Sequence, residues 1–400
     1  MLRSRVMPDD ILAVFADALP GHIENQNRYN PSTVENDPGP LFSTLELRTS
    51  RNTISAWPGY QPTPLTRLPG LARYLNVQEI CYKDEGARFG LGSFKALGGA
   101  YAVNRLLASY PDRSAITVTS ATDGNHGLSV AWGAESAGCR CVIFIHAKVS
   151  AGRERSLKSK GADVIRIDGN YDESVRQCYK AAAANDWIVI SDTSKDDSGN
   201  DVARVVMAGY SVMVAEIIEQ LAGDVPTHVF VQGGVGGLAA TVCECFRLAW
   251  GEAGPRFVIV EPELAPCLFE SCKKGERVTT DVVEETVMAG LSCGEVSAIA
   301  WPTLCRFADD FLTIPDFVVA PTMRLLADGP FFDPPIVAGE SAVAGLAGLI
   351  CSSRHASLAS ALQLDQASRV LVIGTEGATD QALYESMTRL SVRSVQRASI

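Results

Sequence analysis

The sequence predicts an α/β protein whose parallel sheets are covered by helices on both faces. Short β-rich runs alternate with longer helical stretches along most of the chain, and no internal repeat is present. The 34 glycines among the 400 residues suit many tight turns between strands and helices. A chain of this length with 46% hydrophobic residues can bury one large core or two moderate ones. We therefore expect doubly wound, open sheets.

The expected strands follow one another in chain order. Residues 1–45 have weak periodicity and many polar turns, so we expect them to wrap the surface or a partner subunit. Residues 392–400 have the composition of a frayed tail. The expected strands are QEICYKD (78–84), AITVTSA (115–121), CRCVIFIH (139–146), ADVIRID (162–168), WIVISD (187–192), THVFVQG (227–233), RFVIVEP (256–262) and RVLVIG (369–374).

Composition and charge exclude several classes of partner. The chain has 35 basic and 46 acidic residues, a net charge of -11, and no lysine or arginine block, so nucleic acid and anionic membranes are poor partners. No apolar stretch approaches the roughly 18–20 residues that span a bilayer. Asp9 and Asp10 interrupt the start before any secretory core develops. We expect a cytoplasmic protein with neither a membrane nor a nucleic-acid partner.

The 11 cysteines are scattered through apolar segments and form no CxxC pair. Buried single thiols are typical of a reducing compartment. Because no histidine cluster accompanies them, we expect no metal site.

Lys95 lies in the run RFGLGSFKALGGAY (88–101), where the following residues up to Arg105 are small or apolar and the pattern opens a helix. Desolvation disfavours an ammonium, so we expect its pKa to fall and the amine to attack an aldehyde. This chemistry suggests a Schiff base with pyridoxal phosphate (PLP). The alternative is an ordinary lysine whose head reaches solvent at a helix start.

Three further segments favour the chemical interpretation. THVFVQGGVGGLAA (227–240) places glycines between a strand and a helix, where backbone amides and the helix N-terminus attract a phosphate. TVTSATDGNHG (117–127) leads from a strand into a polar loop, the position where open α/β sheets bind ligands. RVLVIGTEGATD (369–380) repeats this form and places Thr375 just after a buried strand.

With these segments the chain resembles the PLP enzymes of the tryptophan synthase β-like group, which includes threonine dehydratases and cysteine synthases. Within that group it is most similar to the diaminopropionate ammonia-lyases. The combination of MAGLxCGE with TDGNHG is what narrows the resemblance. The matching motifs are KDE, RFGL and FK-x-LGG (83–99), TDGNHG (122–127), MAGLxCGE (288–295), GES (339–341) and TEGxTD (375–380), in the expected order.

The resemblance implies the fold type II architecture, in which two doubly wound open parallel-sheet domains hold the cofactor between them. The large PLP-binding domain would comprise residues 1–103 and 205–400, and the smaller inserted domain residues 104–204. The resemblance also implies a homodimer.

The resemblance further assigns roles to individual residues. Lys95 would hold PLP as a Schiff base and later move protons at Cα and at the leaving group. Asn125 would donate to the ring oxygen, Phe94 would pack on the ring face, and Thr375 would face the pyridine nitrogen. A neutral hydroxyl there makes the electron sink shallow, which favours expulsion of a β-substituent. The phosphate would be bound by backbone amides of Gly233, Gly234, Val235, Gly236 and Gly237.

Two carboxylates complete the expected catalytic set. By resemblance Asp123 acts as a base at Cα or holds a substrate ammonium, and Asp192 contacts the same ammonium. The alternatives are an N-cap for Asp123 and a turn residue for Asp192. We expect His126 to be a structural neighbour of Asn125.

Cys267 and Cys293 fall in loops that the resemblance places near the active site. A bond between them is an open possibility, and two free thiols are the state we favour.

The expected reaction is α,β-elimination of 2,3-diaminopropionate through an aminoacrylate intermediate, giving pyruvate and ammonia. The sequence departs from the ammonia-lyase pattern at two places that bear on the identity of the substrate. Gly92 gives GSFK, the form found in dehydratases, and SKDDSGND (194–201) replaces an expected segment that contains aromatic residues and glycine. β-Elimination or β-replacement on another amino acid, such as serine, threonine or O-acylserine, therefore stays open. The alternative that the protein binds PLP but turns over no substrate also stays open.

A dinucleotide site is the remaining alternative. GVGGLA (234–239) fits G-x-G-x-x-A after a strand, and Glu261 follows at the distance of a ribose-binding acid. An NAD-linked oxidoreductase would, however, give no role to Lys95 or to the TDGNHG loop.

Overall fold

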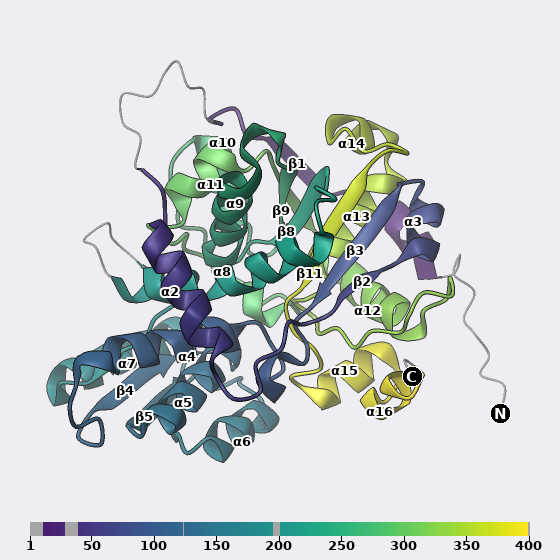
Figure 1. Ribbon diagram of the computed structural model, residues 1–400. Helices are drawn as coiled ribbons and strands as arrows, with labels where there is room; N and C mark the ends of the chain where they lie inside the picture. Colours follow the sequence, from purple (N-terminus) through teal and green to yellow (C-terminus); the bar gives the residue numbers. More distant parts are fainter. Residues whose placement is uncertain (1–10, 29–38, 123, 195–200, 399–400) are drawn as a thin grey trace. The chain divides into compact units, whose positions relative to one another are not determined.

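The computed structural model of the protein describes residues 11–28, 39–122, 124–194 and 201–398 (Figure 1). The chain forms two compact units. The large unit comprises Met1–Pro40, Thr63–Gly86 and Val214–Ile400, and the small unit comprises Leu41–Pro62 and Ala87–Met213.

The large unit is built on a seven-stranded sheet with the order β1-β10-β9-β8-β11-β3-β2. Its five central strands are parallel, whereas β1 and β2 join the two edges in the antiparallel direction. The edge strands and β10 were not among the expected strands. The bounds are β1 (Gly21–Glu24), β2 (Leu65–Arg67), β3 (Glu79–Asp84), β8 (His228–Gln232), β9 (Arg256–Pro262), β10 (Asp310–Ile314) and β11 (Arg369–Gly374).

The central strands β8, β9 and β11 are buried on both faces, which explains why they are largely apolar runs and not alternating patterns. Val258 and Val260 on β9 belong to one core cluster with α13 (Ala344–Arg354). Phe257, the neighbour of Val258, points to the other face and stacks on Phe246 of α9 (Gly237–Trp250), with ring centroids 6.4 Å apart. The sheet is therefore doubly wound, as the sequence predicted.

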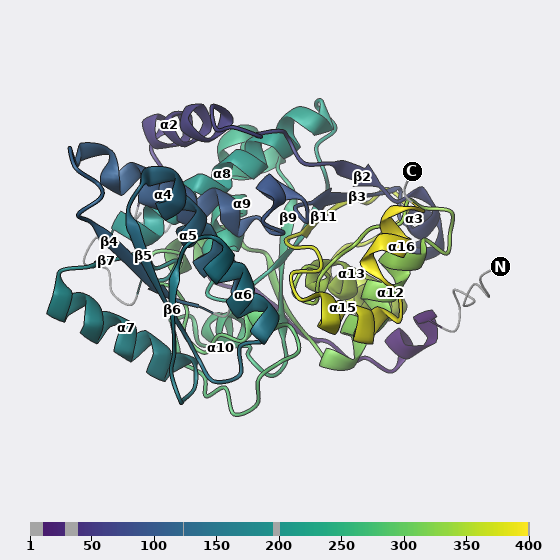
Figure 2. The ribbon, with the colours of Figure 1, turned by 90° about the horizontal axis from the view of Figure 1, so that it is seen from below.

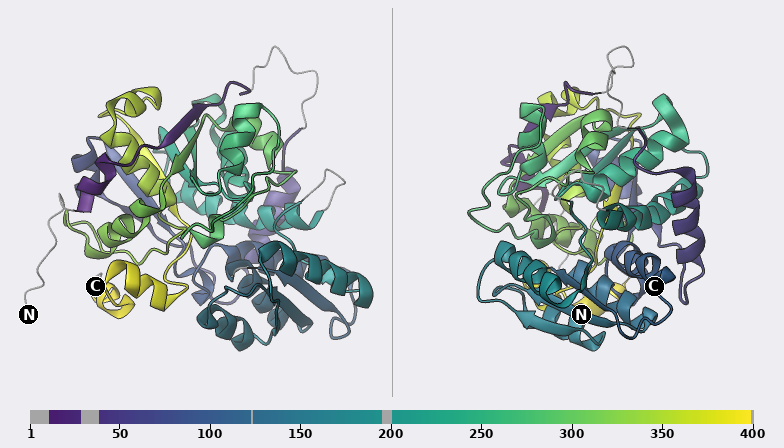
Figure 3. Two further views of the ribbon diagram at one scale, coloured as in Figure 1. Left: turned by 180° about the vertical axis from the view of Figure 1, so that it is seen from behind. Right: turned by 90° about the vertical axis from the view of Figure 1, so that its left-hand side faces the viewer.

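The N-terminal segment is part of this sheet. β1 lies along β10 at the sheet edge, where the left view of Figure 3 shows it in purple. Beyond the strand, Asn25 donates from Nδ2 to the carbonyl of Ala308 at 2.8 Å, and Arg28 forms an ion pair with Asp309. Phe15 is fully buried in the core. The prediction that residues 1–45 wrap the surface or a partner subunit was wrong for this part, which pairs with the sheet and enters the core.

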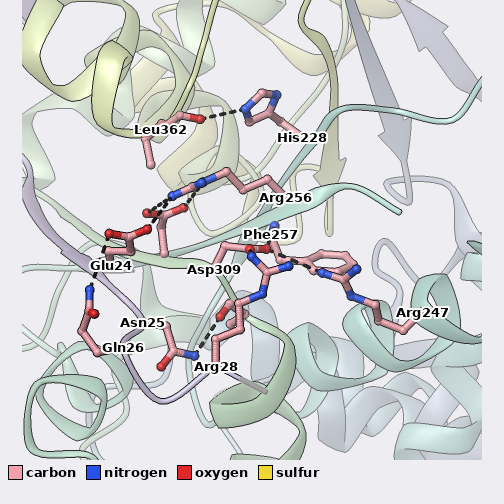
Figure 4. Close-up of polar contacts among 12 residues, drawn as sticks. Glu24, Asn25, Gln26, Arg28, His228, Arg247, Arg256, Phe257, Asp309 and Leu362 are labelled. Atoms are coloured by element: carbon pink, nitrogen blue, oxygen red, sulfur yellow. Dashed lines mark hydrogen bonds and ion pairs between the residues drawn. The ribbon is translucent and has the colours of Figure 1, made fainter. Parts of the chain in front are cut away.

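A charged cluster lies where β9, β10 and the N-terminal segment meet (Figure 4). Arg256 donates from Nε to Asp310 at 2.6 Å, and Arg247 lies 4.0 Å from Asp309. The Phe257 amide donates to Asp309 at 2.7 Å, so these buried carboxylates are paired and hydrogen-bonded. Pairing of this kind offsets the cost of burying charge.

The remaining helices of the large unit cover the sheet and its loops. Residues 392–400 were expected to fray, but α16 begins after Ser391, whose side chain accepts a hydrogen bond from the Ser394 amide. The bounds are α3 (Pro69–Leu75), α10 (Cys267–Lys274), α11 (Trp301–Phe307), α12 (Val319–Asp328), α14 (Ala356–Ala361), α15 (Gln381–Thr388) and α16 (Val392–Gln396).

The small unit has a four-stranded parallel sheet with the order β6-β5-β4-β7. Figure 2 shows α7 on one face of these strands and α4 and α5 on the other. Val142 and Phe144 of β5 pack against Cys178 of α7. The bounds are α2 (Thr44–Ser55), α4 (Lys95–Leu106), β4 (Thr117–Ala121), α5 (Asn125–Ala137), β5 (Arg140–Ile145), α6 (Ala151–Ser159), β6 (Asp163–Arg166), α7 (Tyr171–Asn185) and β7 (Ile188–Val189); α8 (Asp201–Leu221) has its first part in this unit.

The units divide the chain at other positions than those expected. Residues 41–62, 87–103 and 205–213, which were expected in the large domain, belong to the small unit. The physical reason is close packing of α4: a Cβ on Gly99 would lie 2.7 Å from Ser129 Oγ on α5, and a Cβ on Gly98 would lie 2.4 Å from the Tyr210 ring on α8. The glycines let α4 approach both helices, and this places Lys95 in the small unit.

Candidate active site

Lys95 and Asp192 form the centre of a polar cluster in the small unit. Lys95 is the first residue of α4, as the sequence predicted. Its Nζ donates to Asp192 Oδ2 at 2.5 Å, and the two side chains retain exposed fractions of 23% and 19%. The residues that follow Lys95 in the chain are small or apolar, and the carboxylate that it contacts comes from a segment 97 residues away.

The sheet explains why these residues meet. Strands β4 and β7 are parallel neighbours, so the loop after β4 and the residues after β7 leave the sheet at the same edge. The loop after β4 is organised by Thr122, whose Oγ1 accepts hydrogen bonds from the amides of Gly124 and Gly127 at 3.0 and 3.1 Å. Asn125 then begins α5, and Asp192 follows β7.

Asp123, which we expected to be a catalytic base, lies outside the described residues, as do residues 195–200 of the unusual segment after Asp192.

Aromatic side chains and an imidazole surround the lysine. Lys95 Nζ lies 5.3 Å from the Phe94 ring centroid and 5.8 Å from that of Tyr210. The two rings pack with centroids 4.7 Å apart, so Phe94 already has an aromatic neighbour within the protein. His126 is buried, and its Nδ1 lies 3.8 Å from Asp192 Oδ2. The sequence missed Tyr210, which follows Gly209 in an apolar helix without any motif.

Charge and burial set the protonation of this cluster. Burial raises the pKa of Asp192, but the positive charge of Lys95, with a contribution from His126, outweighs it and holds that pKa below its usual range. Burial lowers the pKa of His126; Asp192 opposes this effect and Lys95 adds to it. Burial also raises the pKa of Tyr210, so its hydroxyl stays neutral. The cluster therefore contains a carboxylate that is held in its anionic form beside the lysine.

The predicted phosphate loop lies in the large unit between β8 and α9. Gly234 and Gly236 have φ of 64° and 94°, a region that strongly favours glycine, and Gly236 is the N-cap of α9. A Cβ on Gly233 would lie 2.6 Å from Glu261 Cγ, so the backbone of the loop approaches β9 closely. The sequence predicted this strand, loop and helix correctly.

Thr375 lies at the end of the neighbouring strand, β11, and is buried. Gln232, the last residue of β8, donates from Nε2 to Ile373 O at 2.7 Å, to Ala342 O at 2.9 Å and to Thr375 Oγ1 at 3.4 Å. Its buried Oε1 has no hydrogen-bond partner within the described part of the chain. Gln232 was not predicted, although its place directly before the glycines could have indicated it.

Three of the signature motifs are joined by hydrogen bonds in the large unit. The buried Glu376 accepts from the Ser341 amide at 3.1 Å, and its own carbonyl accepts from the Gly339 amide at 3.0 Å. Ser341 Oγ in turn accepts from the Gly290 amide at 3.1 Å. The MAGLxCGE, GES and TEGxTD segments thus form one connected structure around Glu376, while the neighbouring Glu340 is itself buried.

Glu261 and the two loop cysteines have structural surroundings. Glu261 is fully buried and accepts from the amides of Leu268 and Phe269 at 3.0 and 2.7 Å, where α10 begins. It is therefore committed to this helix, which removes the acid that a dinucleotide site requires. Cys267 Sγ lies 3.5 Å from Gly234 O, and a Cβ on Gly234 would lie 3.9 Å from Cys293 Sγ. All eleven cysteines, including this pair, are free thiols.

Comparison with known proteins identifies the class. Residues 56–376 match the family described as pyridoxal-phosphate dependent enzyme, so the chain belongs to that family. Within it, the chain is 36% identical over 368 residues to the diaminopropionate ammonia-lyase of Escherichia coli K12, covering 87% of this chain and 92% of that protein.

Solved structures of related enzymes have the same fold as this chain. A crystal structure of the E. coli diaminopropionate ammonia-lyase, in complex with an aminoacrylate-PLP azomethine reaction intermediate, has a TM-score of 0.84 and 34% identity and covers 93% of this chain and 97% of that one. A tomato (Solanum lycopersicum) threonine deaminase shares the fold, with a TM-score of 0.69 and 20% identity over 88% of this chain and 96% of that one. The predicted resemblance to diaminopropionate ammonia-lyases and the predicted fold type II architecture are confirmed. The match to a family of pyridoxal-phosphate dependent enzymes does not support the NAD-linked oxidoreductase alternative.

Within the described residues, no helix is long and apolar enough to cross a membrane, and no group of three or more histidine, cysteine or acidic side chains could hold a metal ion.

Proposed function

We propose that this protein catalyses the α,β-elimination of 2,3-diaminopropionate, giving pyruvate and ammonia, with PLP as its cofactor. The observation that carries this proposal is the carboxylate of Asp192 beside the amine of Lys95. A substrate with a second ammonium gives such a carboxylate a partner when the lysine becomes neutral. The extended identity to enzymes that bear this name supports the same substrate.

The residues present fit PLP. The loop of residues 233–237 opens a 14-residue helix, and the two positive φ values let its backbone approach an anion. The amides of Gly233 and Gly236 donate to Val260 O and Gly233 O, so those of Gly234, Val235 and Gly237 would hold the phosphate. Thr375, which accepts from Gln232, would offer a neutral hydroxyl to the pyridine nitrogen. When bound, the cofactor supplies an electron sink for a carbanion at Cα.

The chain's own residues would perform the remaining tasks. Lys95 would anchor the cofactor and move a proton at Cα of the substrate, and Asp192 would bind the substrate's β-ammonium. Asp123, in the loop after β4, would act as a second base. Asn125 would orient the cofactor through its side-chain amide. Phe94, which packs against Tyr210 with the two rings tilted, would keep water from one side of the lysine.

The chemistry gives a definite stoichiometry. Removal of the Cα proton and departure of the β-amino group release one ammonia and leave an enamine. Hydrolysis of that enamine gives pyruvate and a second ammonia. Serine would instead lose water and yield one ammonia for each pyruvate, so the ratio of products identifies the leaving group.

The test is to add 2,3-diaminopropionate to the purified PLP-loaded protein and to record visible absorbance, pyruvate and ammonia together. We expect the absorption to shift and two ammonia molecules to appear for each pyruvate. A protein that forms pyruvate only from serine, or forms none, contradicts the proposal. D-serine and L-serine are the comparison substrates, because a structure of the E. coli enzyme contains D-serine and because Gly92 and Ser93 give the dehydratase form of the motif.

We further propose that the protein is a cytoplasmic homodimer. The family resemblance and the buried free thiols support this proposal. Light scattering coupled to size-exclusion chromatography would contradict it if the mass corresponded to a single 42.7 kDa chain.

A further inference from the structure

His126 is held in one tautomer by its surroundings. It lies in the first turn of α5, is 6% exposed, and its Nε2 is 2.9 Å from the carbonyl oxygen of Ile190. A carbonyl oxygen can only accept a hydrogen bond, so Nε2 must carry a hydrogen. In the neutral imidazole the other nitrogen, Nδ1, is then a bare acceptor.

That bare nitrogen points toward a negative charge. Nδ1 lies 3.8 Å from Asp192 Oδ2, the same oxygen that is 2.5 Å from Lys95 Nζ. Within the described residues Nδ1 has no hydrogen-bond partner. Two acceptors that face each other without a shared proton repel, so the arrangement has room for one proton at Nδ1.

The proposed reaction needs such a place. A lysine attacks an aldehyde or takes a proton from carbon only as a neutral amine. The carboxylate of Asp192 favours a proton on Lys95, and expulsion of that proton to solvent before the substrate binds would leave Asp192 as an uncompensated charge in a largely buried site.

We propose that His126 accepts the proton that Lys95 must lose, with Asp192 as the carrier between them. One proton passes from Nζ to Oδ2, and a proton passes from the Asp192 carboxyl group to Nδ1 as the side chains approach. The cluster begins as ammonium, carboxylate and neutral imidazole, and it ends as amine, carboxylate and imidazolium. Its net charge is unchanged. His126 thus acts on Lys95 through Asp192 and is a positioning residue, not one that contacts the substrate. This role rests on the proposed function.

The electrostatics of the cluster favour this transfer. Lys95 opposes a proton on His126 and Asp192 favours it, so loss of the charge on Lys95 makes His126 the better acceptor. Of the two aromatic neighbours of the lysine, neither competes for the proton, because Phe94 is apolar and burial keeps the Tyr210 hydroxyl neutral. A purely structural histidine would need only its bond to Ile190.

The first test uses protein prepared without PLP, in which nitrogen-15 NMR reports the histidine tautomers. We expect His126 to carry hydrogen on Nε2 and none on Nδ1 at neutral pH. We also expect its pKa to rise in Lys95→Met and to fall further in Asp192→Asn. A hydrogen on Nδ1 in the neutral ring, or a His126 titration that neither substitution moves, would overturn the proposal.

The second test follows how fast Lys95 reacts with added PLP as a function of pH, which requires no amino acid substrate. In His126→Gln the amide can still donate to Ile190 but cannot take up a proton. We expect the pH profile to shift by about one unit toward alkaline pH, and the rate at pH 7 to fall roughly tenfold. His146→Gln is the matched control, because His146 is also 6% exposed and lies in the same unit.

Slowing by the same factor at every pH would show that His126 is only structural. If His126→Gln does not fold, as judged by circular dichroism, His126→Asn replaces it in the same experiment. Failure of diaminopropionate turnover in the wild-type protein would reject the proposed function alone, since the reaction of Lys95 with PLP is measured separately.

Discussion

The small unit and the large unit hold two kinds of functional surface. In the small unit the proposed functional atoms belong to ionisable side chains: Asp192 Oδ2 lies 2.5 Å from Lys95 Nζ and 3.8 Å from His126 Nδ1. In the large unit they are backbone amides and a neutral hydroxyl, fixed by glycines and by Gln232. The proposed function thus assigns chemistry to groups whose charge can change, and anchoring of the cofactor to groups whose charge cannot.

The sharpest test of this comparison is Lys95→Ala. If the small unit supplies the chemistry, this variant should lose covalent PLP attachment and about four orders of magnitude in kcat. The measurements are the visible absorbance of the PLP-loaded protein and pyruvate formation. Lys158→Ala is the matched control, since Lys158 is an exposed lysine of the same unit that pairs with Glu154 at 2.7 Å. Normal turnover by Lys95→Ala would remove the lysine from the mechanism.

A smaller loss is expected from Asp192→Asn, roughly 100-fold in kcat/KM, because the shape is kept and the charge is lost. The folded state holds the pKa of Asp192 below its usual value, so the unfolded state binds more protons as pH falls toward and below about 4. The pair therefore adds stability above that pH and loses it on acidification.

Urea unfolding at several pH values would measure this effect. The wild-type protein should lose stability faster than Asp192→Asn as pH falls below about 5. Parallel curves for the two proteins would show that the ion pair with Lys95 does not stabilise the fold.

On the side of the large unit, Gly234→Ala should weaken PLP binding about tenfold and lower stability by about 1 kcal/mol, because φ is 64° at this position. Gly161→Ala is the control: its φ is 75° and its Cβ would meet nothing within 4 Å. Both variants should lose similar stability, and only the first should lose affinity for PLP, measured by fluorescence titration. Equal affinities would mean that the glycine loop does not bind the phosphate.

The smallest expected effect concerns Glu261, which supports the anchoring loop. Burial raises its pKa to about 8, although two backbone amides oppose this. Because the folded state holds the proton more tightly than the unfolded state, stability should decline as pH rises from about 4.5 to 8. Glu261→Gln cannot titrate, so its unfolding free energy should decline less over that range. A wild-type curve that is flat between these pH values, with the variant equally flat, would contradict the assignment.

Most elements of both units could be predicted from local sequence. The eight expected runs all form strands, because a buried parallel strand is a short apolar run between turns. β1, β2 and β10 were missed: β1 and β2 are short edge strands, whose identity depends on the neighbour they pair with, and β10 mixes Asp310 and Thr313 with its apolar residues. The expected start of the small unit, residue 104, lies after the observed one at Ala87, because close helix packing by Gly98 and Gly99 joins segments far apart in the chain.

The sequence by itself determined the fold class, the helix that begins at Lys95, the glycine loop before α9 and the position of Thr375 after β11, since each depends on residues adjacent in the chain. Only the tertiary structure decided that Asp192 faces Lys95, that His126 presents a bare nitrogen to the same carboxylate, and that Glu261 caps α10. These contacts join segments brought together by the pairing of strands and the docking of helices. The protonation state of a buried group depends on such neighbours, and local sequence does not specify them.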